Sequence, residues 1–295
     1  GRLSRFGSGG LASLQCSTVV ASEGCGDAAL IAQCVAQVLV TADIFPFRCQ
    51  VKLARLHAMN LILLHNDDFF TEDRVKLTDR RRQHLLSTQQ VEVGKRLRVG
   101  KLNGMLGEGL VTGIDAESLE LRIKLTRQPP PPLAVTLLLA LPRPKMLKRI
   151  LQTISSLGVK QLYLINSYRV EKSFWGSPLL RAEKLDEQLL LGLEQARDTI
   201  LPQVHLRQRF KPFVEDELPD LAKGTRALVA HPVAAPGEVF QPGESITLAI
   251  GPEGGFIPYE IEKLQECGFT AISLGERILR VETAVPVLLS RMMAD

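Results

Sequence analysis

Two short segments combine glycines with charged side chains in a way that suits binding and chemistry. Residues 250–256 have the sequence IGPEGGF, and residues 274–284 have the sequence LGERILRVETA. An apolar run precedes each segment, at 246–250 and at 271–274. We therefore expect two buried strands that end in loops rich in backbone amides, which is where α/β proteins build ligand sites.

The glycine spacing limits the ligand. No Lys-Ser/Thr pair follows the glycines and no G-x-G-x-x-G is present, so the pattern disfavours a cradle for nucleotide phosphates. Backbone groups and the apolar residues Ile250, Leu274, Ile278 and Leu279 instead suit an adenine with a thioether-bearing tail. Glycines that only form turns are the alternative. Two such loops with Arg280 and Glu282 between them favour a site.

The elements around these loops alternate between strand and helix after residue 132. Apolar runs predict strands at 134–141, 161–165, 226–230, 246–250 and 271–274. Helices are expected at 145–157, 180–200, 258–267 and 283–293, with Gly158 and Gly268 as left-handed caps. Near-continuous apolar strands that alternate with helices predict a mostly parallel sheet covered on both faces.

The preceding part differs in pattern. Residues 59–126 show short strand-like runs separated by glycines, with a clear period of two at 119–125. This composition predicts a small β-barrel or sandwich. Four consecutive prolines at 129–132 form a stiff spacer. We place domains at 59–128 and 133–295 on either side of it.

Residues 1–58 do not resemble the rest. They hold four of the five cysteines, are rich in small residues, and contain few acids. Three interpretations remain open: an organelle-targeting extension, sequence translated upstream of a natural start at Met59, or a small helical addition. The expected compartment depends on this choice. It is the cytoplasm if the protein is bacterial, and a plastid or mitochondrion if residues 1–58 are a transit peptide.

Composition excludes some classes of protein. The longest nearly uncharged stretch, 28–42, is shorter than the ~20 apolar residues that span a membrane. No Cys/His spacing suits a metal site. The net charge of +4 permits nucleic-acid binding without requiring it. Basic residues cluster at 76–84 and 95–101, either as a solvated face or as a phosphate-binding surface.

The paired strings closely resemble the 16S ribosomal RNA uridine N3-methyltransferases of the SPOUT superfamily. The resemblance extends from Met59 to about Met293 and includes Ala140-Leu141-Pro142, residues 156–159 and Glu194-Gln195-x-Arg197. It implies a PUA-like RNA-binding barrel followed by an α/β domain whose C-terminal segment forms a trefoil knot. It also implies S-adenosylmethionine as the cofactor, a homodimer, and small-subunit ribosomal RNA or a 30S-type particle as the partner, without a metal or a membrane.

The resemblance also implies roles for single residues. Arg280 would stabilise the uridine anion that forms during methylation, and Glu282 would orient Arg280 or accept the N3 proton. Glu282 as a helix dipole partner and Glu253 as a turn residue are the open alternatives. The implied cofactor contacts are Leu248, Ile250, Gly251, Glu253, Gly255, Leu274, Gly275, Ile278, Leu279 and Thr283.

Basic residues supply the implied RNA contacts. These are Arg80, Arg81, Arg82, His84 and Arg98 in the first domain, and Arg169, Lys172 and Arg197 in the second. A surface ion pair of Arg197 with Glu194 and a core position for Trp175 are alternatives. The chain departs from the family at Thr88-Gln89-Gln90, where relatives carry a Val-Leu-Arg string, and this leaves the first domain's RNA contacts open.

Two other functions stay possible. Ribose 2′-O methyltransferases of the same superfamily typically carry a Ser-Leu-Asn string where this chain has residues 280–284, which favours base methylation. A non-catalytic RNA-binding factor for ribosome assembly would not need the intact cofactor strings at 251–255 and 274–284. The target uridine is not determined by the residues themselves.

Overall fold

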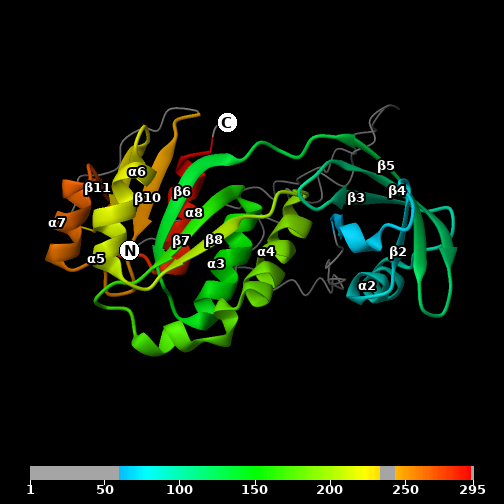
Figure 1. The fold of residues 1–295 in the computed structure, drawn as a ribbon, viewed down its shortest axis with the longest axis horizontal. Coiled ribbons are helices and arrows are strands. Elements are labelled where there is room, and N and C mark those ends of the chain that lie inside the picture. Colours follow the sequence, from blue (N-terminus) through cyan, green and yellow to red (C-terminus); the bar gives the residue numbers. More distant parts are fainter. Residues whose placement is uncertain (1–59, 233–242, 294–295) are drawn as a thin grey trace, which may run out of the picture. The chain divides into compact units, whose positions relative to one another are not determined.

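A computed structural model describes residues 60–232 and 243–293 (Figure 1). The interpretations of residues 1–58 lie outside these described residues. Two sheets organise the described chain, and each has its own buried apolar core. No helix in the described part is long and apolar enough to cross a membrane.

The larger sheet is parallel throughout, which confirms the predicted α/β class. Its strand order is β11-β9-β10-β6-β7-β8. All five residues of the central strand β10 are buried, as expected for a strand covered on both faces. The strands are β6 (Leu133–Ala140), β7 (Val159–Ile165), β8 (Gln203–Arg207), β9 (Arg226–Ala230), β10 (Ile246–Ile250) and β11 (Thr270–Ile272).

Three of the main helices in this described part, α3, α4 and α7, lie between strands, and α8 follows β11. Gly158 and Gly268 have φ angles of 83° and 84°, so the predicted left-handed positions that follow two of the helices are confirmed. The helices are α3 (Pro144–Ser156), α4 (Ala182–Ala196), α7 (Pro258–Glu266) and α8 (Val281–Arg291). Shorter turns of helix are η3 (Lys172–Gly176), η4 (Pro178–Leu180), α5 (Phe210–Pro212), η5 (Phe213–Glu217) and α6 (Leu218–Ala222).

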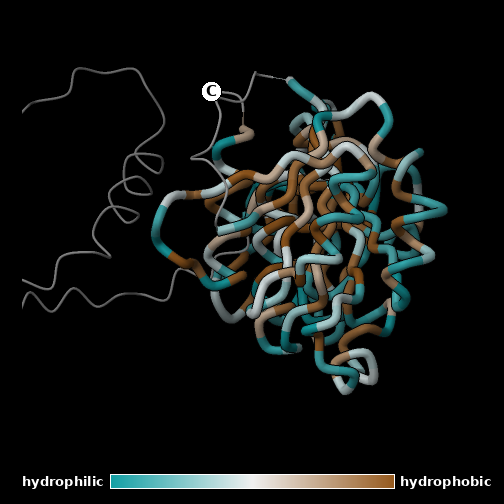
Figure 2. The backbone as a smooth tube through the Cα atoms, turned by 90° about the vertical axis from the view of Figure 1, so that its left-hand side faces the viewer, coloured by the Kyte–Doolittle hydropathy of each residue, from teal (hydrophilic) through white to brown (hydrophobic). Residues whose placement is uncertain are grey.

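Helices α3 and α4 pack closely because small residues meet at their contact. The Ser155 hydroxyl donates to the Leu189 carbonyl at 2.7 Å, and the Ser156 hydroxyl donates to the Gly192 carbonyl at 3.0 Å. A Cβ on Gly192 would lie 2.4 Å from the Gln152 carbonyl oxygen. The two serines therefore join α3 to α4 across this contact. Figure 2 shows the apolar residues gathered inside the fold and the polar residues outside.

The smaller sheet has the order β1-β3-β4-β5-β2, with β1 parallel to β3 and the other pairs antiparallel. The predicted period of two is confirmed in β5, where Leu119, Leu121 and Ile123 are buried. The strands are β1 (Ile62–Leu64), β2 (Arg74–Leu77), β3 (Arg96–Lys101), β4 (Leu106–Ile114) and β5 (Leu119–Arg127), and η2 (Asn66–Asp68) follows β1.

One element in this part was predicted wrongly. Helix α2 (Arg80–Gln89) forms where we expected only strands and turns. Asp79 caps it by accepting a hydrogen bond from the Arg81 amide at 2.9 Å. The helix buries only Arg81 and Leu85, so it has no apolar stripe that would have indicated a helical period.

The predicted helix at 180–200 was too long. Helix α4 ends at Ala196, because Arg197 takes a left-handed φ of 59°, and strand β8 follows. Leu193 of α4 packs with Leu61, Leu63 and Leu106 of the smaller sheet's segment. Helix α4 therefore packs against residues of the smaller sheet's part of the chain, and the pattern of apolar residues in α4 alone cannot indicate this partner.

Candidate active site

A cavity of about 270 Å³ lies at the carboxyl ends of β9, β10 and β11. Both glycine-containing loops contribute to its wall, so the predicted convergence of residues 250–256 and 274–284 is observed. The lining residues are Ala230, His231, Pro232, Ile250, Gly251, Pro252, Glu253, Gly254, Gly255, Ile272, Ser273, Leu274, Gly275, Arg277, Ile278, Leu279, Val281, Ala284 and Leu288.

Glycine is required for the shape of the first loop. Gly255 has a φ of 73°, and its amide donates to the Pro252 carbonyl at 2.7 Å to close a tight turn. A Cβ on Gly251 would lie 3.0 Å from the Phe256 amide nitrogen. The chain therefore turns back on itself directly after β10 and leaves backbone groups along the cavity.

Most of the predicted cofactor contacts line this cavity, and two do not. Ile250, Gly251, Glu253, Gly255, Leu274, Gly275, Ile278 and Leu279 are among the lining residues. Leu248 is 0% exposed inside the core, because it lies two residues before the end of β10. Thr283 is an exposed residue of the first turn of α8 outside the lining.

Two parts of the wall were missed from the sequence. Ala230 ends β9, and His231 and Pro232 follow it; their position is a consequence of the parallel sheet, since carboxyl ends of neighbouring strands meet at one edge. The predicted strand at 226–230 was the signal that could have identified them. Val281 and Leu288 come from α8, where they are buried.

Arg280 and Glu282 lie on either side of the lining residue Val281, although neither lines the cavity itself. Arg280 is the exposed N-cap residue of α8, and its carbonyl accepts from the Ala284 amide at 2.8 Å. Glu282 lies in the first helical turn, where a carboxylate also interacts favourably with the helix dipole. The two interpretations of Glu282 are therefore compatible.

A buried carboxylate joins two loops beside the cavity. Glu260 of α7 is 2% exposed and accepts from the Tyr168 amide at 2.7 Å and the Ser167 hydroxyl at 3.0 Å. It also accepts from the Ile257 amide at 3.0 Å. The loop after β7 is thereby attached to the start of α7. Arg169 follows directly, and its Nη1 donates to the Gly254 carbonyl.

Lys172 and Trp175 lie in η3, within the same loop. Lys172 is exposed. Trp175 is partly buried against the core, and its Nε1 donates to the Asn166 Oδ1 at 2.9 Å. This contact favours the interpretation of Trp175 as a packing residue.

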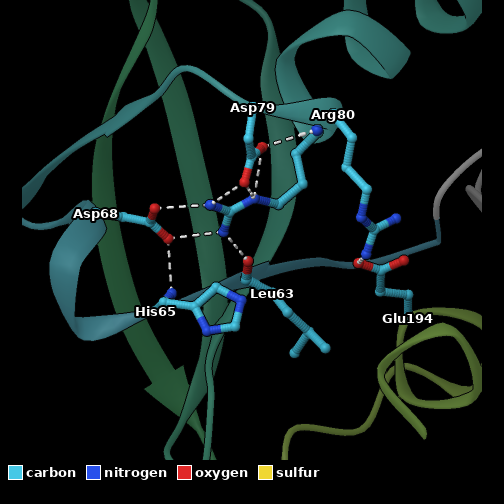
Figure 3. A network of polar contacts seen from close by, with 7 residues as sticks. Leu63, His65, Asp68, Asp79, Arg80 and Glu194 are labelled. Atoms are coloured by element: carbon cyan, nitrogen blue, oxygen red, sulfur yellow. Dashed lines mark hydrogen bonds and ion pairs between the residues drawn. The ribbon is translucent and has the colours of Figure 1, made fainter. Parts of the chain in front are cut away.

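The arginine cluster of α2 is engaged in contacts within the protein (Figure 3). Arg81 is paired with Asp68 at 2.7 Å and with Asp79 at 2.8 Å, and it donates to the Leu63 carbonyl at 2.6 Å. Its side chain is only 6% exposed. Burial opposes the charged form of Arg81, but the bonds to Asp68 and Asp79 outweigh it and raise the pKa of the guanidinium. These contacts indicate that Arg81 is a structural residue and not part of an RNA-binding surface.

The neighbours of Arg81 also have internal partners. Arg80 pairs with Glu194 of α4 at 3.0 Å, and burial raises the pKa of Glu194 against the charge of Arg80. Arg82 donates to the carbonyls of Asp115 and Ala116. The buried Nε2 of His84 has no hydrogen-bond partner in the part of the chain that the structure describes.

Arg98 belongs to a different surface, a basic groove of about 860 Å³ on the smaller sheet. In the pairing of the strands, Arg98 of β3 lies opposite Glu108 of β4, and Glu108 lies opposite Lys124 of β5. Likewise, Arg96 lies opposite Leu110, and Leu110 lies opposite Arg122. These side chains therefore share one face. Arg96 belongs to the basic cluster noted at 95–101, whereas Arg122, Lys124 and Arg127 were not predicted, although the alternation in β5 indicated two of them.

Comparison with known proteins identifies the family. A family model described as an RNA methyltransferase domain matches residues 129–293, which is more than half of the 295-residue chain. The chain belongs to this RNA methyltransferase family. A relative from Treponema pallidum, named ribosomal RNA small subunit methyltransferase E, is 28% identical over 233 residues, 77% of this chain and 87% of that protein. A relative of the same name from Synechocystis is 26% identical and covers 86% of this chain and 84% of its own length.

Solved structures share the fold of this methyltransferase. A ribosomal RNA small subunit methyltransferase E from Neisseria gonorrhoeae, bound to S-adenosyl methionine, has a TM-score of 0.64 and 21% identity, covering 79% of this chain and 96% of that one. A putative methyltransferase from Legionella pneumophila, also with bound cofactor, has a TM-score of 0.63 and 22% identity over the same shares. Both of these solved proteins hold the methyl donor.

The site of this methyltransferase combines two chemical environments. Apolar side chains and backbone groups form most of the cavity wall, which also includes the charged residues Glu253 and Arg277. Arg143 and Arg169 add positive charge, since they contact Glu253 and Gly254 of this wall. The arrangement can hold a largely neutral ring system and guide a polyanionic substrate to it.

Proposed function

We propose that the protein uses S-adenosylmethionine to methylate N3 of a uridine in small-subunit ribosomal RNA. The observation that carries the proposal is the cavity at the carboxyl edge of the sheet, formed by both glycine-containing loops and flanked by Arg280 and Glu282. The names of the relatives support ribosomal RNA as the substrate.

The lining residues fit an adenosine-containing cofactor. Ile250, Leu274, Leu279 and Leu288 offer apolar surface to a base, and the turn at residues 251–255 offers backbone groups to its polar edge. The volume of about 270 Å³ is close to the lower end of the roughly 300–1,000 Å³ that is usual for ligand sites. Bound S-adenosylmethionine would supply a methyl group that is activated for transfer to a nucleophile.

The protein's own groups must activate the nucleophile. Uridine N3 carries a proton and has to lose it before its lone pair can attack the methyl carbon. The Arg280 guanidinium would stabilise the negative charge that develops on the uracil O2 or O4. Glu282 would orient Arg280 or take the N3 proton. Both residues lie one position from Val281, which lines the cavity, so their backbone lies beside the wall at which the cofactor would bind.

The RNA would extend from the site over basic surfaces of both sheets. In the second part of the chain, Arg169 and Lys172 lie in the loop after β7, and Arg197 ends α4. In the first part, the exposed face with Arg96, Arg98, Arg122, Lys124 and Arg127 is the stronger candidate, since five basic residues line one groove there, whereas Arg81 of α2 is buried between two carboxylates. Arg96 and Arg122 of this face form exposed ion pairs with Glu108 and Asp73. Arg80, Arg82 and His84 would contact RNA separately from this face, since Arg80 and His84 line another cavity with residues of α3 and α4.

The same proposal includes the finer features of the fold. Residues 59–128 would be a PUA-like barrel, and residues 133–295 a SPOUT domain whose C-terminal segment forms a trefoil knot. Two copies would form a homodimer, with RNA bound by both. The strand order, in which β10 lies between β9 and β6 and β11 lies outside β9, supports a sheet of this kind.

The proposal is tested by methyl transfer from labelled S-adenosylmethionine to small-subunit ribosomal RNA. Replacing Arg280 by alanine should lower turnover by roughly 10²–10³-fold, because it removes a charge that acts mainly in the transition state. Cofactor affinity by calorimetry should change little. Arg291→Ala removes the same charge from the other end of α8 and serves as the control. Wild-type turnover in Arg280→Ala would remove Arg280 from the mechanism, and a wild-type protein without cofactor binding would contradict the enzymatic function.

A further inference from the structure

Two arginines from neighbouring strands converge on the rim of the cavity. Arg143 lies between β6 and α3, and its Nε is 3.4 Å from the Oε2 of Glu253. Arg169 follows β7, and its Nη1 donates to the carbonyl of Gly254. Glu253 and Gly254 are consecutive and both line the cavity. Since β10, β6 and β7 are adjacent in the sheet, three strand ends meet at this point.

The arginines differ in how they are held. Arg169 is preorganised, because Glu260 bonds the two residues before it and fixes their loop to α7. Within the described residues, the Arg143 side chain is held by a single ion pair, whose side chains are 61% and 44% exposed. Such an exposed pair adds little to stability and is exchanged readily for another anion.

The surroundings of Arg143 favour an anion. Arg143 is the N-cap of the 13-residue helix α3, whose first turn contains no acidic residue, and an arginine side chain has no acceptor with which to cap the helix amides. The positive end of the helix dipole therefore points toward this position. A guanidinium can bind a phosphate through two parallel hydrogen bonds, which suits it better than lysine to this task.

We propose that Arg143 and Arg169 form a phosphate-binding pair at the cavity rim, and that an RNA phosphate replaces Glu253 as the partner of Arg143. The inference rests on the proposed RNA substrate and adds Arg143 and the exchange with Glu253 to it. Glu253 keeps the Arg143 side chain extended across the rim before RNA binds. The phosphate beside the target uridine then takes the position of the carboxylate, which places the base at the opening of the cavity.

The exchange predicts opposite effects of two single substitutions. The probe is a fluorescent transcript of small-subunit ribosomal RNA, titrated at several salt concentrations. Arg143→Ala should weaken binding roughly tenfold and reduce the slope of log affinity against log salt by about 1, as for one lost phosphate contact. Glu253→Gln should tighten binding, because the phosphate no longer competes with a carboxylate. Arg143→Lys should recover part of the affinity.

A control is the Arg226–Glu244 ion pair, whose arginine begins β9 and so lies at the amino ends of the strands, away from the cavity. Arg226→Ala should leave RNA affinity unchanged. Unchanged affinity and salt slope in Arg143→Ala, or weaker RNA binding in Glu253→Gln, would overturn the inference. Calorimetry with S-adenosylmethionine on Arg143→Ala and Arg226→Ala tests whether the cavity is intact. If the wild-type protein binds no cofactor and transfers no methyl group, the proposed function fails instead.

Discussion

Replacing Glu260 by glutamine should destabilise the protein and loosen the rim of the cavity together. The carboxylate is 2% exposed and accepts three hydrogen bonds, from Ser167, Tyr168 and Ile257. Glutamine has nearly the same shape, but one of its two terminal groups is a donor. At least one backbone amide must then face another donor without an acceptor.

The structure sets the magnitude of this effect. An unsatisfied buried donor costs roughly 1–3 kcal/mol, and the bonds that remain become neutral and weaker by about 1 kcal/mol each. Removing the buried charge of Glu260 avoids its desolvation and offsets part of this loss. We therefore expect a decrease of about 2–4 kcal/mol in the free energy of unfolding.

Urea denaturation measures this change directly. The slope of the free energy of unfolding against urea concentration should be the same for the wild type and the variant, which shows that both unfold alike. Glu262→Gln, an exposed position on the same helix, is the control and should change stability by less than about 0.5 kcal/mol. RNA affinity should also fall in Glu260→Gln, and this fall should largely disappear when Arg169 is already alanine. A Glu260→Gln protein as stable as the control variant would refute the reasoning, and additive effects on RNA affinity would separate Glu260 from Arg169.

Two further predictions concern stability. Gly192→Ala places a Cβ 2.4 Å from the Gln152 carbonyl oxygen and should lower the free energy of unfolding by about 1–3 kcal/mol. Chemical denaturation measures this loss, and no loss would mean that α3 and α4 can move apart without cost. Burial pushes the pKa of Asp79 upward, but the bonds and charge of Arg81 outweigh it and lower the pKa from 3.8. This stabilisation is present above the unfolded pKa and is lost as pH falls through the folded one. Asp79→Asn should therefore flatten the pH dependence of thermal stability below about pH 4, and an unchanged profile would contradict it.

Much of the larger sheet could be predicted because its signals are local. Strands β9 and β10 have the predicted bounds, since each is an apolar run bounded by polar or glycine residues. The two glycine-containing loops were also expected to converge, because parallel strands bring their carboxyl ends to one edge. His231 after β9 also lies in the cavity wall because the strands are parallel, but no sequence motif marks this loop.

The errors occur where long-range contacts decide. Helix α2 is polar, and the partner of Arg80 lies 114 positions away at Glu194. The cluster of arginines therefore predicted a phosphate surface, whereas Arg81 is buried between two carboxylates. Likewise, nothing in the sequence near Arg143 indicates the ion pair with Glu253, which depends on the adjacency of β6 and β10.

The position of the transferred methyl group tests the central claim most directly. The protein is incubated with methyl-labelled S-adenosylmethionine and unmodified small-subunit ribosomal RNA or 30S-type particles, and the RNA is digested to nucleosides and separated with standards. The account predicts label in 3-methyluridine, with loss of most of the label in Arg280→Ala. Label in 2′-O-methyl nucleosides, or no transfer by a protein that binds the cofactor, would contradict it.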